Sequence, residues 1–148
     1  MQETRSILKL TLLFFLALSC ANPHYVTEEE RGISDISGEC GYFFSSEKIC
    51  LKTEWITKPT ESSFGEMSLS FVDPVDQTRF IDPLQEPYIH LWMPSMGHGS
   101  SPVTMERVDV GRYRAKDIFF IMTGEWDVHY QLKSGSHVVE EKIQKVLI

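Results

Sequence analysis

Two methionines and a histidine lie within six residues of one another in a segment that also holds glycine and proline. They are Met93, Met96 and His98, in the stretch 91-LWMPSMGHGSSPVTME-106. Thioether sulfur is a soft donor and imidazole also suits copper, so this set favours copper, particularly Cu(I). The glycines on both sides of His98 permit the tight turns needed to wrap three donors around one ion. The segment therefore predicts a copper-binding loop with Met93, Met96 and His98 as its ligands.

Other methionines and histidines could complete such a site if neighbouring strands run antiparallel. The strand before the loop would then end at the edge of the sheet where a strand over 126–133 begins. Residues just after the loop and just before this strand would therefore lie close to the loop. Two histidines further down these strands become ligands only if both face the same open side of the sheet. The further candidate ligands are Met105, Met122, His129 and His90.

The same residues have a second interpretation that involves no metal. Met93 continues the apolar positions Ile89 and Leu91, and methionine commonly fills irregular gaps in a core. An exposed group of large apolar side chains at this loop would instead mark a protein–protein interface. The members of that predicted patch are Trp92, Met93, Met96 and Trp126. The alternative function is therefore a protein-interaction or structural envelope lipoprotein.

The first residues have the features of an export signal. Arg5 and Lys9 precede an apolar run, LTLLFFLALS over 10–19, which has signal-peptide length and is short for a bilayer span. The residues that end this run resemble a bacterial lipobox, in which cleavage before Cys20 leaves its thiol to carry diacylglycerol. We therefore predict a lipoprotein signal peptide over 1–19.

The segment 20–39 is predicted to be a lipidated tether, because it is polar, acidic and without hydrophobic period. Ala21, and not aspartate, follows Cys20. By resemblance to such signals, this implies the outer membrane of a Gram-negative cell, on the periplasmic side. The acyl chains would provide the anchoring energy. We expect a cell-envelope protein that contacts the membrane through its lipid.

The two remaining cysteines, Cys40 and Cys50, are ten residues apart. An exported protein meets an oxidising compartment. Once Cys20 is assigned to lipidation, two cysteines remain, and an even number favours a disulfide. The segment 45-SSEK-48 could turn the chain so that the two thiols face each other. A metal-binding thiol pair is the alternative, but the usual CxxC spacing is absent.

Several other functions are disfavoured by composition and motifs. The net charge of −7, with no basic run, argues against nucleic-acid binding. A blue-copper electron-transfer site needs a cysteine thiolate, and the assignments above leave none. The chain contains neither the HExxH motif of zinc proteases nor the GxSxG motif of serine hydrolases. We therefore predict that the protein is not an enzyme.

From residue 40 onward the chain consists of short alternating runs separated by turn residues, and no window shows a sustained helical stripe. This pattern predicts an all-β antiparallel sandwich of about seven strands over 40–148. The predicted strands are 50–57, 64–73, 88–93, 103–110, 112–122, 126–133 and 137–148.

The segment 88–132 resembles the YtkA-like domain family, which is related to the FixH family. The matching features are the MPxMGHG loop over 93–99, the GxY over 111–113 and the MxGxW over 122–126. The resemblance implies an immunoglobulin-like β-sandwich on the outer side of a membrane, and some relatives are linked to copper delivery or oxidase assembly. It implies Met93, Met96 and His98 as metal positions, and structural roles for Gly124 and Trp126.

Overall fold

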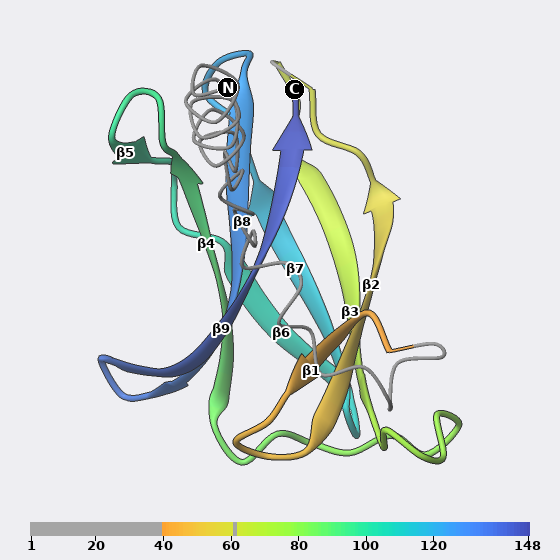
Figure 1. Ribbon diagram of the computed structural model, residues 1–148. Helices are drawn as coiled ribbons and strands as arrows, with labels where there is room; N and C mark the ends of the chain where they lie inside the picture. Colours follow the sequence, from red (N-terminus) through yellow and green to blue (C-terminus); the bar gives the residue numbers. More distant parts are fainter. Residues whose placement is uncertain (1–39, 61) are drawn as a thin grey trace, which may run out of the picture. The chain divides into compact units, whose positions relative to one another are not determined.

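The computed structural model describes residues 40–60 and 62–148, and Figure 1 shows its strands. Within these residues every regular element is a β-strand. No described segment is a helix of the length and apolar character that crossing a membrane requires. The predicted signal peptide (1–19), the lipidation site Cys20 and the tether (20–39) lie outside the described residues.

Nine strands are present in the described part of the chain. They are β1 (Tyr42–Phe44), β2 (Ile49–Thr57), β3 (Gly65–Val72), β4 (Glu86–Met93), β5 (His98–Gly99), β6 (Thr104–Asp109), β7 (Arg112–Ile118), β8 (Glu125–Ser134) and β9 (His137–Leu147). Seven of them correspond to the predicted strands. The two very short strands, β1 and β5, were not predicted.

The strands form two sheets in which all neighbours are antiparallel. One sheet has the order β1-β2-β3-β7-β6 and the other has the order β5-β4-β8-β9. The order β2-β3-β7-β6 corresponds to strands A-B-E-D of an immunoglobulin domain, and β5-β4-β8-β9 to C′-C-F-G. The predicted all-β, immunoglobulin-like antiparallel sandwich is therefore confirmed, with β1 as an addition at the edge of the first sheet.

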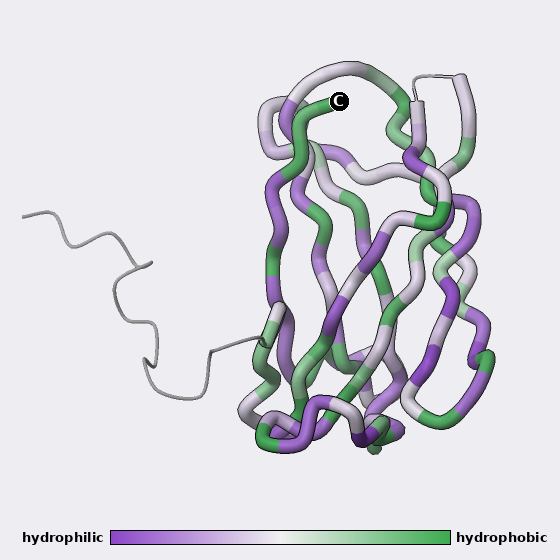
Figure 2. The backbone as a smooth tube through the Cα atoms, turned by 90° about the vertical axis from the view of Figure 1, so that its right-hand side faces the viewer, coloured by the Kyte–Doolittle hydropathy of each residue, from purple (hydrophilic) through white to green (hydrophobic). Residues whose placement is uncertain are grey.

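The core is made of alternate residues on strands from both sheets. Figure 2 shows hydrophobic and hydrophilic residues alternating along the strands. The central inward-facing side chains of β3 and β8 are at most 2% exposed: Met67, Leu69, Phe71, Trp126, Val128, Tyr130 and Leu132. Burial of one such side chain contributes roughly 1.5–3 kcal/mol to folding. Period-two alternation of apolar and polar residues along these two strands identifies their buried faces directly.

The strand predicted over 112–122 is shorter in the structure and ends at Ile118. Its pairing with β3 stops where Ile118 lies opposite Gly65. A Cβ atom at Gly65 would lie 2.6 Å from Cδ of Pro59, so the chain before β3 crosses closely over this point. The residues after Ile118 have no strand partner. The carbonyl of Phe119 accepts a hydrogen bond from the Ser100 hydroxyl in place of a strand pairing.

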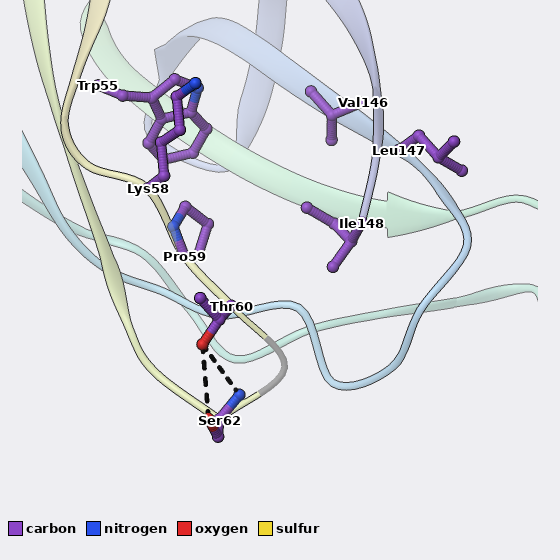
Figure 3. Close-up of a pocket in the computed structure, with 8 residues that line it drawn as sticks. All are labelled: Trp55, Lys58, Pro59, Thr60, Ser62, Val146, Leu147 and Ile148. Atoms are coloured by element: carbon purple, nitrogen blue, oxygen red, sulfur yellow. Dashed lines mark hydrogen bonds between the residues drawn. The ribbon is translucent and has the colours of Figure 1, made fainter.

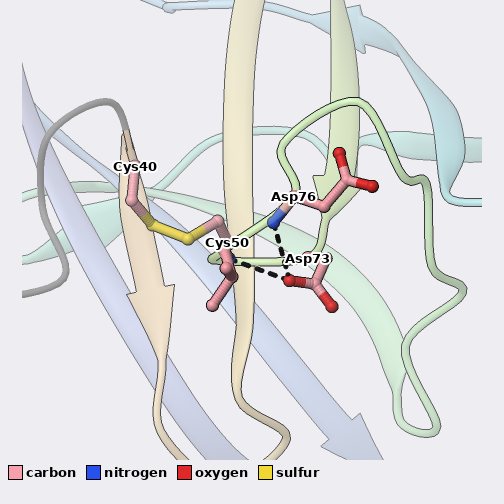
Figure 4. Close-up of a disulfide and its surroundings, with 5 residues drawn as sticks. Cys40, Cys50, Asp73 and Asp76 are labelled. Atoms are coloured by element: carbon pink, nitrogen blue, oxygen red, sulfur yellow. Dashed lines mark hydrogen bonds between the residues drawn. A yellow bond between two sulfur atoms is a disulfide. The ribbon is translucent and has the colours of Figure 1, made fainter.

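The predicted disulfide between Cys40 and Cys50 is present, with the two Cα atoms 5.4 Å apart (Figure 4). It spans the hairpin of β1 and β2, whose connection is the predicted turn over 45–48. Lys48 in this turn has a positive φ of 54°, a conformation that tight turns require. The disulfide thus fixes the start of the described domain to the strand β2.

Candidate functional site

The predicted copper loop is the hairpin between β4 and β5. The amides of Met96 and Gly97 both donate to the carbonyl of Met93, at 3.2 and 2.9 Å. Gly97 has a φ of 66°, which a glycine adopts without steric cost. Pro94 cannot continue the ladder because it lacks an N–H. The sequence therefore folds into a tight turn that returns the chain along β4.

This turn places Met93 and His98 directly opposite each other in the pairing of β4 with β5. Residues in direct register project from the same face of a sheet. Met93 is 4% exposed and belongs to the hydrophobic core. His98 therefore also faces inward, and its ring lies 6.2 Å from the ring of the buried Trp126. The structure thus brings together two of the three predicted ligands at one end of the sandwich.

The imidazole of His98 is oriented by its own backbone neighbour. Its Nδ1 lies 3.0 Å from the carbonyl oxygen of Gly99. A carbonyl can only accept, so Nδ1 carries the proton in this hydrogen bond and Nε2 has the lone pair. Fixing the tautomer in this way is how proteins prepare a histidine for metal coordination through Nε2.

Met96, the third predicted ligand, lies in the turn itself and is 58% exposed. Its thioether is accessible from solvent, in contrast to that of Met93. An ion at this end of the sandwich would have a buried sulfur donor, a half-buried imidazole and an exposed sulfur donor. Backbone hydrogen bonds hold the turn that contains Met96 to Met93, so all three side chains belong to one tight hairpin.

The further candidate ligands are distributed over different parts of the sandwich. Met122 is partly buried against the core, and its carbonyl accepts a hydrogen bond of 3.1 Å from the indole N–H of Trp126. Met105 is also partly buried, but it lies on β6 in the other sheet. His90 and His129 lie opposite each other on β4 and β8, on the outer face of their sheet. They project from the face opposite to that of Met93 and His98, so the structure does not bring them together with these two side chains.

Among the described residues, no three His, Cys, Asp or Glu side chains gather as a metal-binding group. A metal site at the β4–β5 loop would therefore have to use methionine sulfur, as the sequence predicts. With two thioethers and one imidazole, such a donor set matches Cu(I) better than a hard cation.

The apolar patch predicted for the alternative function is not present in the form expected. Trp126 is fully buried and Met93 is 4% exposed, so both contribute to the core. Trp92 points to the outer face of its sheet, away from Met93. The error arose because the sequence shows the large apolar residues around the loop but not the depth at which each one lies.

Other apolar side chains are exposed in the loops and strand ends that flank the core. Those of Phe64, Met96, Ile121 and Leu147 are between 43% and 83% exposed. Beside Leu147, a partly open groove of about 740 Å³ lies between the end of β2 and the end of β9 (Figure 3). Its lining is Trp55, Lys58, Pro59, Thr60, Ser62, Val146, Leu147 and Ile148.

Comparisons of the chain with family models, with curated proteins and with solved structures found no match. The resemblance to the YtkA-like family therefore remains a prediction that rests on the motifs over 93–99, 111–113 and 122–126.

Proposed function

We propose that this protein is a lipid-anchored cell-envelope protein that binds Cu(I) through Met93, Met96 and His98. Its role would be to handle or deliver the metal, without catalysis. The observation that carries the proposal is the direct pairing of Met93 with His98, whose Nδ1 is held by the Gly99 carbonyl so that Nε2 is available. Met96 supplies a second, exposed sulfur on the same tight turn.

The proposed location rests on the sequence and on the disulfide. The apolar run ending at Cys20 supports export and lipidation, with the protein held at the periplasmic side of the outer membrane in a Gram-negative cell. The Cys40–Cys50 disulfide is consistent with an oxidising compartment. In such a compartment, methionine and histidine are suitable copper ligands because they remain available when thiols are oxidised. Membership of the YtkA-like family would agree with this role.

The proposal is tested by anaerobic titration of the full chain, in mild detergent, with Cu(I) against a competing chelator. We expect the triple variant Met93→Leu, Met96→Leu, His98→Ala to lose more than roughly ten-fold in affinity. The matched control is Met67→Leu, because Met67 is a buried methionine on β3, in the other sheet. Leucine replaces methionine in a core at a cost usually below about 1.5 kcal/mol, so the fold should persist. Equal affinity in the triple variant and the control would contradict the proposal.

The alternative function is protein docking through exposed apolar side chains, and the 58% exposure of Met96 is the observation that favours it at this loop. Two substitutions separate the two functions. Met96→Leu keeps an apolar surface but removes the sulfur, whereas Met96→Ala removes both. Copper binding predicts that both variants weaken Cu(I) affinity equally. Docking predicts that Cu(I) affinity is unaffected and that only Met96→Ala loses a partner recovered by cross-linking.

A further inference from the structure

The outer face of the sheet β5-β4-β8-β9 carries a second group of potential metal ligands. His90 on β4 and His129 on β8 are directly opposite each other across the two central strands. Their ring centroids are 5.7 Å apart. Two imidazoles that bind one ion through Nε2 at about 2.0–2.1 Å have ring centroids roughly 5–6 Å apart at open angles. The backbone register therefore already holds these two rings at a spacing suitable for a shared ion.

The ring of His129 is oriented by an acidic residue on the next strand. Its Nδ1 lies 3.1 Å from Oε2 of Glu141, which also accepts a hydrogen bond of 3.0 Å from the Gln131 amide. A carboxylate that accepts from Nδ1–H leaves the lone pair on Nε2, the arrangement commonly seen behind metal-bound histidines. The Nε2 of His129 is buried and has no hydrogen-bond partner in the described part of the protein.

The ring of His90 lies beside β5, where Gly99 leaves space for it. A Cβ atom at Gly99 would be 3.3 Å from Cε1 of His90, closer than most real contacts. Burial lowers the pKa of His90, and the neighbouring His129 and Lys133 lower it further, while Glu141 acts in the opposite direction. The imidazole of His90 is therefore favoured in the neutral form that binds metals.

A carboxylate on the same face has an unexplained oxygen. Asp127 lies two residues before His129 on β8 and projects from the same side of the sheet. Its Oδ1 is buried without a hydrogen-bond partner, and only three buried side-chain atoms in the described residues have this property. Two of the three, Oδ1 of Asp127 and Nε2 of His129, are thus on this one face. An unpartnered buried acceptor destabilises a fold, and a bound cation or water is a usual explanation for one.

We propose that His90 and His129 form a binding site for a divalent transition-metal ion that prefers imidazole, such as Zn²⁺ or Cu²⁺. Asp127 is the candidate third ligand, and Glu141 is a positioning residue that holds His129. In the structure, Asp127 and the two rings do not form a three-ligand group. A water molecule, or Asp127 after rotation of its side chain, would complete the coordination of the ion. An imidazole and carboxylate set favours divalent ions, whereas the thioethers of the β4–β5 loop favour Cu(I). The two sites lie on opposite faces of one sheet.

The test is a titration of the full chain, in mild detergent, with Zn²⁺ alone against a competing chelator. We expect His90→Gln and His129→Gln each to weaken Zn²⁺ binding by more than roughly ten-fold, and Glu141→Gln to weaken it by about ten-fold. The matched controls are His137→Gln, at the start of β9, and His98→Gln, in β5 on the inner face. Both should bind Zn²⁺ as the unchanged chain does. Absence of Zn²⁺ binding to the unchanged chain, or equal affinity in all four histidine variants, would overturn the proposal.

A second measurement uses only the unchanged protein, so it does not depend on the folding of any variant. Long-range proton–nitrogen NMR spectra report the two ring nitrogens of each histidine separately. We expect Zn²⁺ to shift the Nε2 signals of two histidines together, while Nδ1 of one of them stays protonated in its bond to Glu141. Shifts confined to His98 or to His137 would contradict the site. Because the readout is Zn²⁺ on the outer face, failure here would leave the Cu(I) proposal for the loop untouched.

Discussion

At the scale of single residues, the candidate copper loop depends on contacts that fix side chains rather than on the ligands alone. Met93 extends into the core, and its terminal methyl group lies against Gly124, just before β8. Gly124 has a φ of 135°, and its N–H and carbonyl are both paired with Ile148. A side chain at this position would be strained and would overlap Cε of Met93. Gly124 therefore determines where the buried sulfur lies.

We expect Gly124→Ala to lower the free energy of unfolding by about 2–3 kcal/mol, chiefly because a φ of 135° strains any residue with a side chain, and in addition the end of the Met93 side chain has to move aside. The matched control is Gly135→Ala, where φ is also positive at 60° but no atom lies within 4 Å of the added Cβ. It should lose only about 1 kcal/mol from backbone strain. Urea denaturation measures both values. Equal losses in the two variants would show that Met93 does not press against Gly124.

At the scale of strands, β9 shows how polar contacts can replace an apolar inner face. Its inward positions include Glu140 and Lys142, whereas Val139 and Ile143 point outward and are 41% and 47% exposed. Glu140 accepts hydrogen bonds from the amides of Ser45 and Ser46 at 3.0 and 2.8 Å. It thereby joins β9 to the turn between β1 and β2, across the open side of the sandwich.

This link predicts a pH-dependent contribution to stability. Burial alone would raise the pKa of Glu140, but the amides of Ser46 and Ser45 and the ammonium of Lys142 lower it to about 2, from an ordinary value of 4.5. A carboxyl group with a depressed pKa in the folded state stabilises the fold fully above its unfolded pKa. The contribution is lost as the pH falls from about 4.5 towards 2.

We therefore expect Glu140→Gln to lower the free energy of unfolding by about 2 kcal/mol at neutral pH, which is typical for hydrogen bonds to a charged group. The difference from the unchanged protein should shrink as the pH is lowered through this window. Denaturation curves recorded between pH 2 and 7 test this, with the exposed Glu54→Gln on β2 as control. A difference that does not vary with pH would mean that the carboxylate charge is not what joins β9 to the turn.

At the scale of the whole molecule, the longer strands could be predicted because each runs for six or more residues between turn residues. Short strands have no such run. β5 consists of His98 and Gly99 alone and exists only because the turn at Gly97 returns these residues to β4. The sequence shows which donor types the loop contains, but it could not show that Met93 and His98 are direct cross-strand partners.

The register between strands that are far apart in the sequence could not be predicted either. The alternation along β8 places His129 outward, and His90 occupies an outward position on β4. Whether the two meet depends on how β4 and β8 are aligned, and the thirty-eight residues 91–128 lie between the two histidines. The structure places them directly opposite each other. The sandwich thus separates the predicted ligands into an inner methionine–histidine pair and an outer histidine pair.

The central claim is that Cu(I) is held by sulfur and imidazole at the β4–β5 loop, and X-ray absorption at the copper edge tests it most directly. The spectrum of the Cu(I)-loaded full chain should show sulfur neighbours together with imidazole nitrogen. In the variant Met93→Leu, Met96→Leu the sulfur contribution should disappear, while Met67→Leu should leave it unchanged. A first shell of nitrogen and oxygen only, identical in the unchanged chain and in the double variant, would contradict the account.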